Sequence, residues 1–400
     1  MQGKEISFTQ KEATIFLMIM PFLKPEYFSY VPGVSQIYSL AKYAFLAFLL
    51  LYFVGAMARG LIKFHYFSGL ILALNFYPVL RMLVGAGWNG EPVKQFVDVL
   101  GLLLICENYQ KDWKSLIRAF MTYCECIVYL NFLTILLFPN GLYHIGLYRD
   151  NWLLGYSNSE VKYLILAGLV AILYGYTTET KARSIVLGCV IAASLLMLGS
   201  VTGLVGVISM IGLYVLQSKK DFNLFNLKNI AIIVVICFIY FIVEQNIVNY
   251  VSLIRDLTGK TVTFTSRFNI WSKTLEMWAA NPIFVYGWKT ASFRGLQYDN
   301  VYATNAHNTF LEYLYLGGVI EISLFVSVIY VLYRLGKKHQ NTVPIRAIYS
   351  CIGGFLVMML TEAYVTPTVQ LIYLMSYFAS LHVADREKGE PDGKCDCPRL

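Results

Sequence analysis

His307 is the residue of this sequence best suited to acid–base chemistry, because it separates a polar stretch, 251–306, from a long apolar run. An imidazole takes up and releases protons near neutral pH, so it can accept the proton of a substrate hydroxyl. Asn305 and Asn308 flank it, and their carboxamides can orient either the imidazole or a polar substrate. We therefore expect His307 to act as a general base, with Asn305 and Asn308 as substrate-binding neighbours.

Arg267 is a cation suited to binding an anion, since a guanidinium stays charged and holds phosphate oxygens through two parallel hydrogen bonds. It begins an amphipathic stretch that Asn281-Pro282 ends, within a segment where basic residues outnumber acidic ones. Such a segment attracts anions. The simpler alternative is a helix that lies on the membrane surface with a solvated charged face. Its aromatic anchors would then be Trp271, Trp278 and Trp288.

The elements that carry these residues belong in a membrane. With 57% hydrophobic and 14% charged residues, a soluble fold of 400 residues would leave too much apolar surface in water. Continuous apolar runs predict an all-α polytopic membrane protein, with about twelve transmembrane helices in a single domain over 1–385. A short cytoplasmic tail, 386–400, follows. The runs lie near 13–31, 37–56, 66–84, 93–109, 116–138, 161–176, 184–199, 202–216, 229–250, 307–333, 346–363 and 366–384.

The distribution of lysine and arginine orients this domain. Most of the 32 lysines and arginines fall in segments that are cytoplasmic if the N-terminus is cytoplasmic, which is the usual bias of inserted membrane proteins. Both termini are then cytoplasmic in a plasma or inner membrane, and 251–306 is one large extracytoplasmic loop. Arg149 lies in a second outer loop, 139–160. The same bias explains the net charge of +8 without a nucleic-acid partner.

The outer segments do not carry the ligands of a metal-dependent transferase. No outer loop pairs carboxylates in an Asp-x-Asp pattern, whereas divalent ions in such enzymes need clustered oxygen ligands. We therefore expect a reaction without a metal and without another cofactor.

Three motifs follow one another between 266 and 318. Arg267 stands in Ser-Arg-Phe-Asn-Ile-Trp, Asn-Pro and Gly-Trp follow within 281–288, and His307-Asn308 opens a helix that carries a glycine pair. In this order the motifs resemble the signature of the superfamily of O-antigen ligases and Wzy-type oligosaccharide repeat-unit polymerases. The span count, the orientation and the large loop before the tenth helix agree with that superfamily, so the resemblance extends over most of the chain.

The resemblance implies an inverting, metal-independent glycosyltransferase that acts outside the membrane. Its donor would be an oligosaccharide on a polyprenyl pyrophosphate, such as undecaprenyl pyrophosphate, and its acceptor a sugar hydroxyl. His307 would deprotonate the acceptor, and Arg267 would hold the pyrophosphate. Val201 stands where the family tends to carry an earlier arginine, so a second cation must come from elsewhere. The candidates are Arg149, Arg294 and Arg81.

Within this class we expect a polymerase that joins lipid-linked repeat units into capsule, exopolysaccharide or O-antigen. Its partners would be the bilayer and, beside it, flippase and chain-length regulator proteins. A ligase that passes finished glycan to another acceptor needs the same base and cation, and it is the first alternative. A flippase or exporter of the same lipid-linked sugar is the second, because buried carboxylates can mark an ion path. The carboxylates are Glu125, Glu244 and Glu362.

Overall fold

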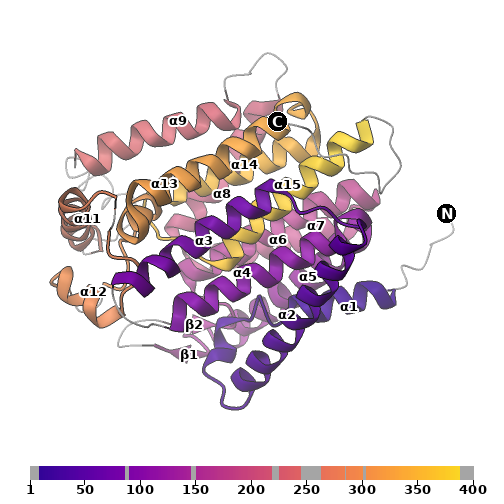
Figure 1. Cartoon of the computed structure of the whole chain (residues 1–400), viewed down its shortest axis with the longest axis horizontal. Coiled ribbons are helices and arrows are strands. Elements are labelled where there is room, and N and C mark those ends of the chain that lie inside the picture. The colour runs from indigo at the N-terminus through magenta and orange to yellow at the C-terminus, as the bar shows by residue number, and fades with distance from the viewer. Residues whose placement is uncertain are drawn as a thin grey trace. The chain divides into compact units, whose positions relative to one another are not determined.

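The computed structural model drawn in Figure 1 describes most of the chain. The described ranges are 9–85, 90–145, 150–218, 225–244, 263–283, 285–300 and 303–387. Three sequence predictions lie wholly or partly outside these ranges: Arg149, the first part of the 251–306 loop and most of the 386–400 tail. The chain divides into two compact units. The first consists of Met1–His65, Val97–Gly199 and Leu371–Leu400, and the second of Tyr66–Phe96 and Ser200–Gln370.

The described ranges contain six helical stretches that are long and apolar enough to cross a membrane, by length and composition. These stretches are Val34–Ala58, Tyr66–Val84, Gly90–Leu137, Ser157–Thr178, Val201–Ser218 and Thr309–His339. Shorter apolar helices span Ala182–Leu198, Leu227–Val243 and Val343–Met358. The all-α membrane-type fold is therefore confirmed, whereas twelve spans and a single large outer loop remain predictions.

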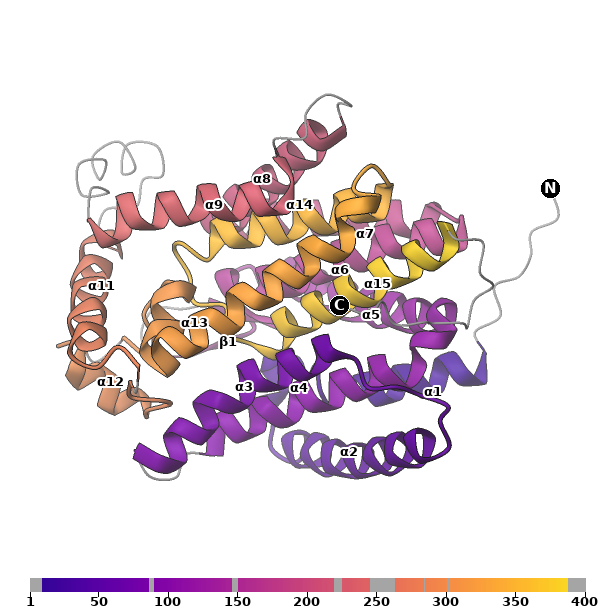
Figure 2. The same cartoon turned by 45° about the horizontal axis from the view of Figure 1, so that its top comes forward.

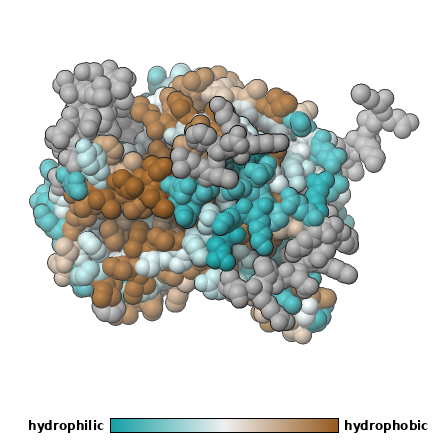
Figure 3. Space-filling view, turned by 90° about the horizontal axis from the view of Figure 1, so that it is seen from above, coloured by the Kyte–Doolittle hydropathy of each residue, from teal (hydrophilic) through white to brown (hydrophobic). Residues whose placement is uncertain are grey.

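The surface also has the character of a membrane protein. Apolar side chains form broad areas in the space-filling view of Figure 3, and large hydrophobic residues are exposed along several helices. Leu40 and Leu51 of α2 (Val34–Ala58) are both 76% exposed. Such an apolar surface suits a hydrocarbon environment, where a helix satisfies its backbone polar groups within itself.

The first unit is built around α5 (Trp113–Leu137), which packs against α1, α6 and α7. Its other helices are α1 (Gln10–Ile19), α2, the second part of α4 (Gly90–Tyr109), α6 (Ser157–Thr178), α7 (Ala182–Leu198) and the end of α15 (Pro367–Glu387). Two short 3₁₀ turns join them, η1 (Glu26–Ser29) and η2 (Gln110–Asp112).

The predicted first span, 13–31, is wrong in its extent. α1 begins after Thr9, which caps it in a capping box with Glu12, and ends at Ile19. Its 10 residues reach about 15 Å, half of the hydrocarbon thickness. Pro21 and Pro25 follow it, and proline cannot continue a helix because it lacks the N–H and clashes with the preceding turn.

A small antiparallel sheet occupies the segment predicted as the second outer loop, and the all-α prediction did not include it. The strands β1 (Tyr143–His144), β2 (Asp150–Trp152) and β3 (Gly155–Tyr156) lie in that order. The indole Nε1 of Trp152 donates a hydrogen bond of 2.8 Å to the carbonyl of Phe138, which ties the sheet to the end of α5. Strands of two or three residues are too short to produce an alternating hydropathy pattern.

The second unit contains the segments that carry the motifs. Its helices are α3 (Tyr66–Gly85), α8 (Val201–Ser218), α9 (Leu227–Cys237), α11 (Thr263–Ala280), α12 (Ala291–Gln297), α13 (Thr309–Gly336) and α14 (Val343–Met358). A π-helix, η4 (Phe238–Val243), continues α9, and a 3₁₀ turn, η6 (Lys337–His339), follows α13. Figure 2 shows α9 beside α13 and α14, with α11 across the end where α13 begins.

Glycines let α8 and α14 approach closely within this unit. A Cβ added at Gly206 would lie 2.1 Å from Sδ of Met358, and one added at Gly354 would lie 2.8 Å from the carbonyl oxygen of Gly206. Small residues at such positions bring helix backbones together, which is how helices associate in a membrane.

A break divides α13 at Gly318, where φ is 61° and ψ is −146°. The backbone N–H of Val319 donates to the carbonyl of Pro282 at 3.0 Å, and a Cβ on Gly318 would lie 2.2 Å from that carbonyl oxygen. Only glycine permits both this backbone conformation and this approach. The break therefore lets the turn after α11 dock on α13, and it sets the direction of the first half of α13, which begins beside His307.

Candidate functional site

His307 lies directly before α13 in a strained backbone conformation. Its φ is 46°, in the left-handed region that side chains other than glycine rarely adopt. The carboxamide Oδ1 of Asn305 accepts a hydrogen bond of 2.8 Å from the backbone N–H of His307 and stabilises the turn. Strain of this kind is found at functional sites, where the surrounding structure holds a side chain in place.

Asn308 begins α13 as its N-cap. Its Oδ1 accepts from the N–H of Leu311 at 3.0 Å, and its Nδ2 donates to the carbonyl of Leu360 at 2.8 Å. The side chain is fully buried, and its polar atoms are used within the protein. Asn308 therefore joins the start of α13 to the segment that connects α14 and α15.

Thr309 makes the same connection at three further points. Its N–H donates to the carbonyl of Met359 at 2.9 Å, and its hydroxyl donates to the carbonyl of Glu362 at 2.8 Å. The hydroxyl also accepts from the N–H of Tyr364 at 2.9 Å. These bonds fix the 359–364 segment against the start of α13, so that Glu362 lies beside His307.

Glu362 is the residue that brings Arg267 and His307 together. The Nη2 of Arg267 donates to one carboxylate oxygen of Glu362 at 2.8 Å, and Nδ1 of His307 lies 3.7 Å from the other oxygen. The latter distance is longer than a hydrogen bond, and Nδ1 of His307 has no hydrogen-bond partner among the described residues. The side chains of Arg267, His307 and Glu362 are 13%, 18% and 7% exposed, so the cluster is largely enclosed and keeps a small accessible surface.

The electrostatics of the cluster favour an ionised Glu362. Burial raises the pKa of this carboxyl group, but His307 and Arg267 beside it lower the pKa by more, so the net pKa is below the usual value of 4.5. The Nη1 of Arg267 also donates to the carbonyl of Thr361 at 2.6 Å. The guanidinium is thus held in a defined position by the carbonyl of Thr361 and the carboxylate of Glu362.

Arg294 forms a second ion pair, with Glu312, inside the protein. The residue is 1% exposed, and its Nη1 donates to Glu312 at 2.6 Å and to the carbonyl of Thr304 at 3.1 Å. The other carboxylate oxygen of Glu312 accepts from the N–H of Ala306 at 2.9 Å. The guanidinium carbon lies 4.2 Å from the centre of the Tyr315 ring. This pair holds the residues that lead into His307.

Trp271 is not an anchor at the membrane surface, so the expectation for this residue was wrong. Its ring is fully buried, and its Nε1 donates to the carbonyl of Ala306 at 3.0 Å. It packs with Phe268, Leu311 and Ile242 in one apolar cluster. The apolar face of α11 is therefore covered by the protein around Trp271, and this places Arg267, on the same helix, next to the start of α13. An amphipathic pattern shows that a helix has an apolar face but not what covers that face.

The other predicted arginines lie in different environments. Arg81 donates through Nη2 to the carbonyl of Val285 at 3.2 Å, and Arg149 is outside the described residues.

Gly287, of the Gly-Trp motif, has a φ of 65°, and a Cβ there would lie 2.8 Å from the backbone nitrogen of Met82. The motif therefore marks a close approach of the 285–288 turn to α3. Of the predicted cations in the described ranges, Arg267 is the one that contacts the acidic partner of His307.

Sequence reasoning assigned Glu362 to a possible ion path and missed it as a member of this cluster. A signal was present, since Glu362 is a carboxylate near the outer end of the predicted span 346–363, on the same predicted side of the membrane as His307. No local pattern links it to Arg267 and His307, which lie 95 and 55 positions earlier, because the contacts depend on the fold.

The fold and the cluster define a class of protein, a helical membrane protein with a histidine, a carboxylate and an arginine gathered at the start of a broken helix. Residues 185–326 match the family model described as O-antigen ligase, and this match supports the resemblance to the superfamily of O-antigen ligases and Wzy-type polymerases. The matched residues include Arg267, Trp271 and His307, whereas Glu362 lies beyond them. No curated protein matches the chain.

Proposed function

We propose that this protein is a membrane glycosyltransferase that polymerises oligosaccharide repeat units carried on a polyprenyl pyrophosphate, such as undecaprenyl pyrophosphate. The product would be capsule, exopolysaccharide or O-antigen. One observation carries the proposal: Glu362 joins Arg267 and His307 in one cluster, so a base and a phosphate-binding cation occupy the same site. The match of residues 185–326 to the family model described as O-antigen ligase supports the reaction class.

The reaction needs little beyond these groups, because a pyrophosphate is already an activated leaving group. His307 takes the proton of the acceptor hydroxyl, and the hydroxyl oxygen attacks the anomeric carbon of the donor. The bond from that carbon to the pyrophosphate oxygen breaks, and the negative charge that develops there is stabilised by Arg267. Attack from the face opposite the leaving group inverts the configuration at the anomeric carbon. No metal or other cofactor takes part in this scheme.

Glu362 would orient the base. With the Nδ1 proton of His307 directed at Glu362, Nε2 is the nitrogen that accepts the proton from the acceptor. The carboxylate then stabilises the imidazolium that forms, as the acidic member of a catalytic triad does. Arg267 donates to Glu362 in this structure, so the arriving pyrophosphate would share the guanidinium with this carboxylate.

The remaining predicted substrate ligands would shape the site. The side chains of Asn308 and Arg294 are bonded within the protein, and that of Asn305 accepts from the N–H of His307. We assign Asn305 and Asn308 to positioning His307, and Arg294 to fixing the segment before it. Arg149 remains the candidate for a second contact to the pyrophosphate.

The protein would act as a multi-pass protein of the plasma or inner membrane, with both termini cytoplasmic and the site facing outward. The positive-inside distribution of lysine and arginine supports this orientation. A flippase that supplies the lipid-linked units and a chain-length regulator would be its partners.

A ligase is the second candidate, favoured by the description of the matched family as O-antigen ligase. A ligase would use the same base and cation and would differ in its acceptor. In a polymerase the acceptor is another lipid-linked glycan, whereas in a ligase it is a different molecule.

Purified protein in lipid vesicles, supplied with lipid-linked repeat unit and a chelator of divalent ions, provides the test. A ladder of longer lipid-linked glycans supports the polymerase, and transfer only to an added acceptor supports the ligase. Movement of the lipid across the bilayer without glycosidic bond formation would support the flippase and overturn the proposal. Activity that is lost with the chelator and returns with a divalent ion would overturn the metal-independent mechanism.

A further inference from the structure

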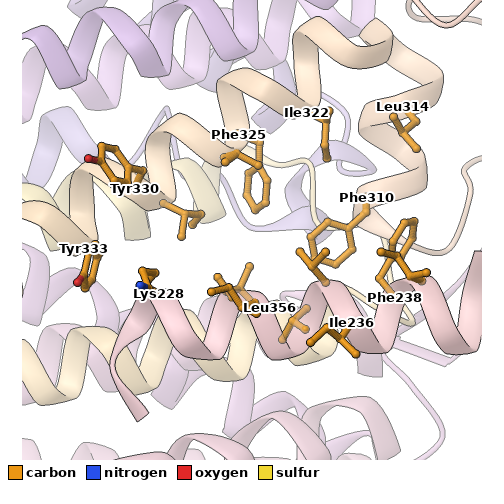
Figure 4. A pocket seen from close by; sticks show the side chains of 17 residues that line it. Lys228, Ile236, Phe238, Phe310, Leu314, Ile322, Phe325, Tyr330, Tyr333 and Leu356 are labelled. Carbon is orange, nitrogen blue, oxygen red and sulfur yellow. The ribbon is translucent and has the colours of Figure 1, made fainter. Parts of the chain in front are cut away.

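An apolar groove of about 550 Å³ runs between α9 with its π-helix and the second half of α13. Figure 4 shows it from close by, with Phe238 and Phe310 at one end and Lys228 and Tyr333 at the other. Its volume is within the range of sites that bind small organic molecules. All of its walls belong to the second unit.

The chemistry of the groove changes from one end to the other. Aliphatic and aromatic side chains line most of the groove. The residues with polar groups, Lys228, Tyr330 and Tyr333, lie at one end (Figure 4). The opposite end contains Phe310, three residues after His307 in the first turn of α13. A hydrocarbon chain fits such walls because they offer apolar contact and leave no polar group unpaired.

The groove is continuous with the apolar cluster behind the candidate site. The ring centres of Phe238 and Phe310 are 5.3 Å apart, and Phe238 and Leu314 pack in the cluster that contains Trp271 and Phe268. Phe268 is the neighbour of Arg267 in α11. One buried apolar cluster therefore connects the end of the groove with the residue next to the candidate phosphate-binding cation.

We propose that this groove binds the isoprenoid chain of the lipid that carries the donor oligosaccharide. This inference rests on the proposed function, because it assigns the charged head of the same lipid to Arg267. A polyprenyl pyrophosphate joins an anion directly to a long apolar chain, and its site must offer a cation beside an apolar groove. In this structure the apolar cluster that contains Phe268 lies between the end of the groove and Arg267.

Two further observations fit this occupant. The distance along α9 from Lys228 to Phe238 is about 15 Å at 1.5 Å per residue, which accommodates several isoprene units. The π-helix begins at Phe238, where the groove meets the apolar cluster, and π-helical turns are frequent at functional sites. A membrane phospholipid with its phosphate at Lys228 is the competing occupant.

A matched pair of substitutions on α9 tests the groove. Ile232 lines it and is 49% exposed, whereas the adjacent Ile233 does not line it and is 45% exposed. Ile232→Trp fills the groove, and Ile233→Trp adds the same bulk on another face of the helix. For a donor on a long polyprenyl chain, we expect Ile232→Trp to raise KM about tenfold, since each buried methylene contributes a factor of about four. With a donor on a chain of two isoprene units the KM should stay unchanged, and Ile233→Trp should alter neither value.

Photolabelling gives a readout that does not depend on glycan transfer. A polyprenyl pyrophosphate with a diazirine in its chain should label peptides that contain 231–239 and 322–330, less so in Ile232→Trp than in Ile233→Trp. Excess polyprenyl phosphate should prevent the labelling, and vesicles of phosphatidylglycerol should not. Equal competition by phosphatidylglycerol would identify a phospholipid site and overturn the proposal, as would a wild-type KM for Ile232→Trp with the long-chain donor. Labelling of the groove in a wild-type protein that transfers no glycan would instead remove the proposed function and retain the lipid site.

Discussion

Each of the two units contains a histidine beside a glutamate. The two pairs differ in the distance between the side chains and in how far these are exposed, and we call His65–Glu107 the closed pair and His307–Glu362 the open pair. In the first unit, Nδ1 of His65 lies 2.8 Å from Glu107, and the two side chains are 4% and 0% exposed. In the second unit, Nδ1 of His307 lies 3.7 Å from Glu362, and the two side chains are 18% and 7% exposed.

The residues around the two histidines differ as well, and those around His65 enclose it more tightly. The His65 ring packs edge-on against Tyr377 and Phe378, and its backbone N–H also donates to Glu107, at 3.1 Å. These contacts exclude a substrate, so the pair serves the packing of helices. His307 has a left-handed backbone, a loose contact to its carboxylate and an arginine on the other side of that carboxylate. A catalytic histidine needs an orienting partner and an open face, and only the second pair offers both.

Loss of the open pair's imidazole should have the largest effect. His307→Ala should fold and insert normally while the rate of glycan transfer falls by about 10²- to 10⁴-fold, because a positioned base is removed. The measurement is the turnover of purified enzyme with lipid-linked repeat unit. His144→Ala is the control, since His144 also lies beside a carboxylate, Asp150, but its side chain is 63% exposed and far along the chain from the motifs. Comparable loss in both variants would remove the base assignment.

Substitution of Arg267 should have the next largest effect. Arg267→Lys should be nearly as damaging as Arg267→Ala, at about 2.7–4 kcal/mol of transition-state stabilisation, because an ammonium keeps the charge but loses the paired donors. The ratio kcat/KM for the lipid-linked donor measures it. Lys273→Ala changes an exposed basic residue on the same helix, which pairs with Asp299, and should retain activity. Full activity of Arg267→Ala at normal protein levels would exclude the phosphate-binding role.

Glu362→Gln should reduce kcat by about 10- to 100-fold, less than the loss of the base itself, because Glu362 acts through His307. Glu362→Asp should recover part of the loss, and the pH profile of kcat should shift in Glu362→Gln. Unchanged activity with an unchanged pH profile would show that the open pair is structural, like the closed one.

The lowered pKa of Glu362 also predicts how the stability of the protein depends on pH in the acid range. Since the folded-state pKa of Glu362 is lowered, its contribution to the free energy of unfolding is present above the usual pKa of 4.5 and is lost as pH falls through the lower, folded-state value. As the pH is lowered from 7 to 3, the midpoint of thermal unfolding should therefore fall more steeply for the wild type than for Glu362→Gln.

The smallest effect on activity should come from the closed pair. His65→Ala removes the imidazole partner of buried Glu107, which keeps its hydrogen bonds from the backbone N–H of residue 65 and from Gln110, and should lower the free energy of unfolding by about 1–3 kcal/mol. The thermal midpoint in detergent measures this loss, and turnover per folded molecule should stay at the wild-type value. A stable His65→Ala protein with strongly reduced turnover would break the distinction between the pairs.

Much of the helical fold could be predicted, because hydropathy over a window of about 20 residues is a local property. The run 202–216 was found as α8, and 37–56 as α2. The errors have local or tertiary causes. Prolines shortened the first helix, strands of two or three residues left no periodic signal, and protein rather than membrane covers Trp271.

The sequence by itself determined the membrane class, and it predicted the reaction class through the 266–318 motifs and two candidate side chains for it, Arg267 and His307. Residue type and spacing decide these properties. Only the tertiary structure decided that Glu362 joins Arg267 to His307. It also decided that Arg294 pairs with Glu312 inside the protein, and that one end of an apolar groove lies at Phe310 in the first turn of α13. These depend on contacts between residues far apart in the chain, and such contacts exist only when the break at Gly318 and the hydrogen bonds of Thr309 have set the helices in place.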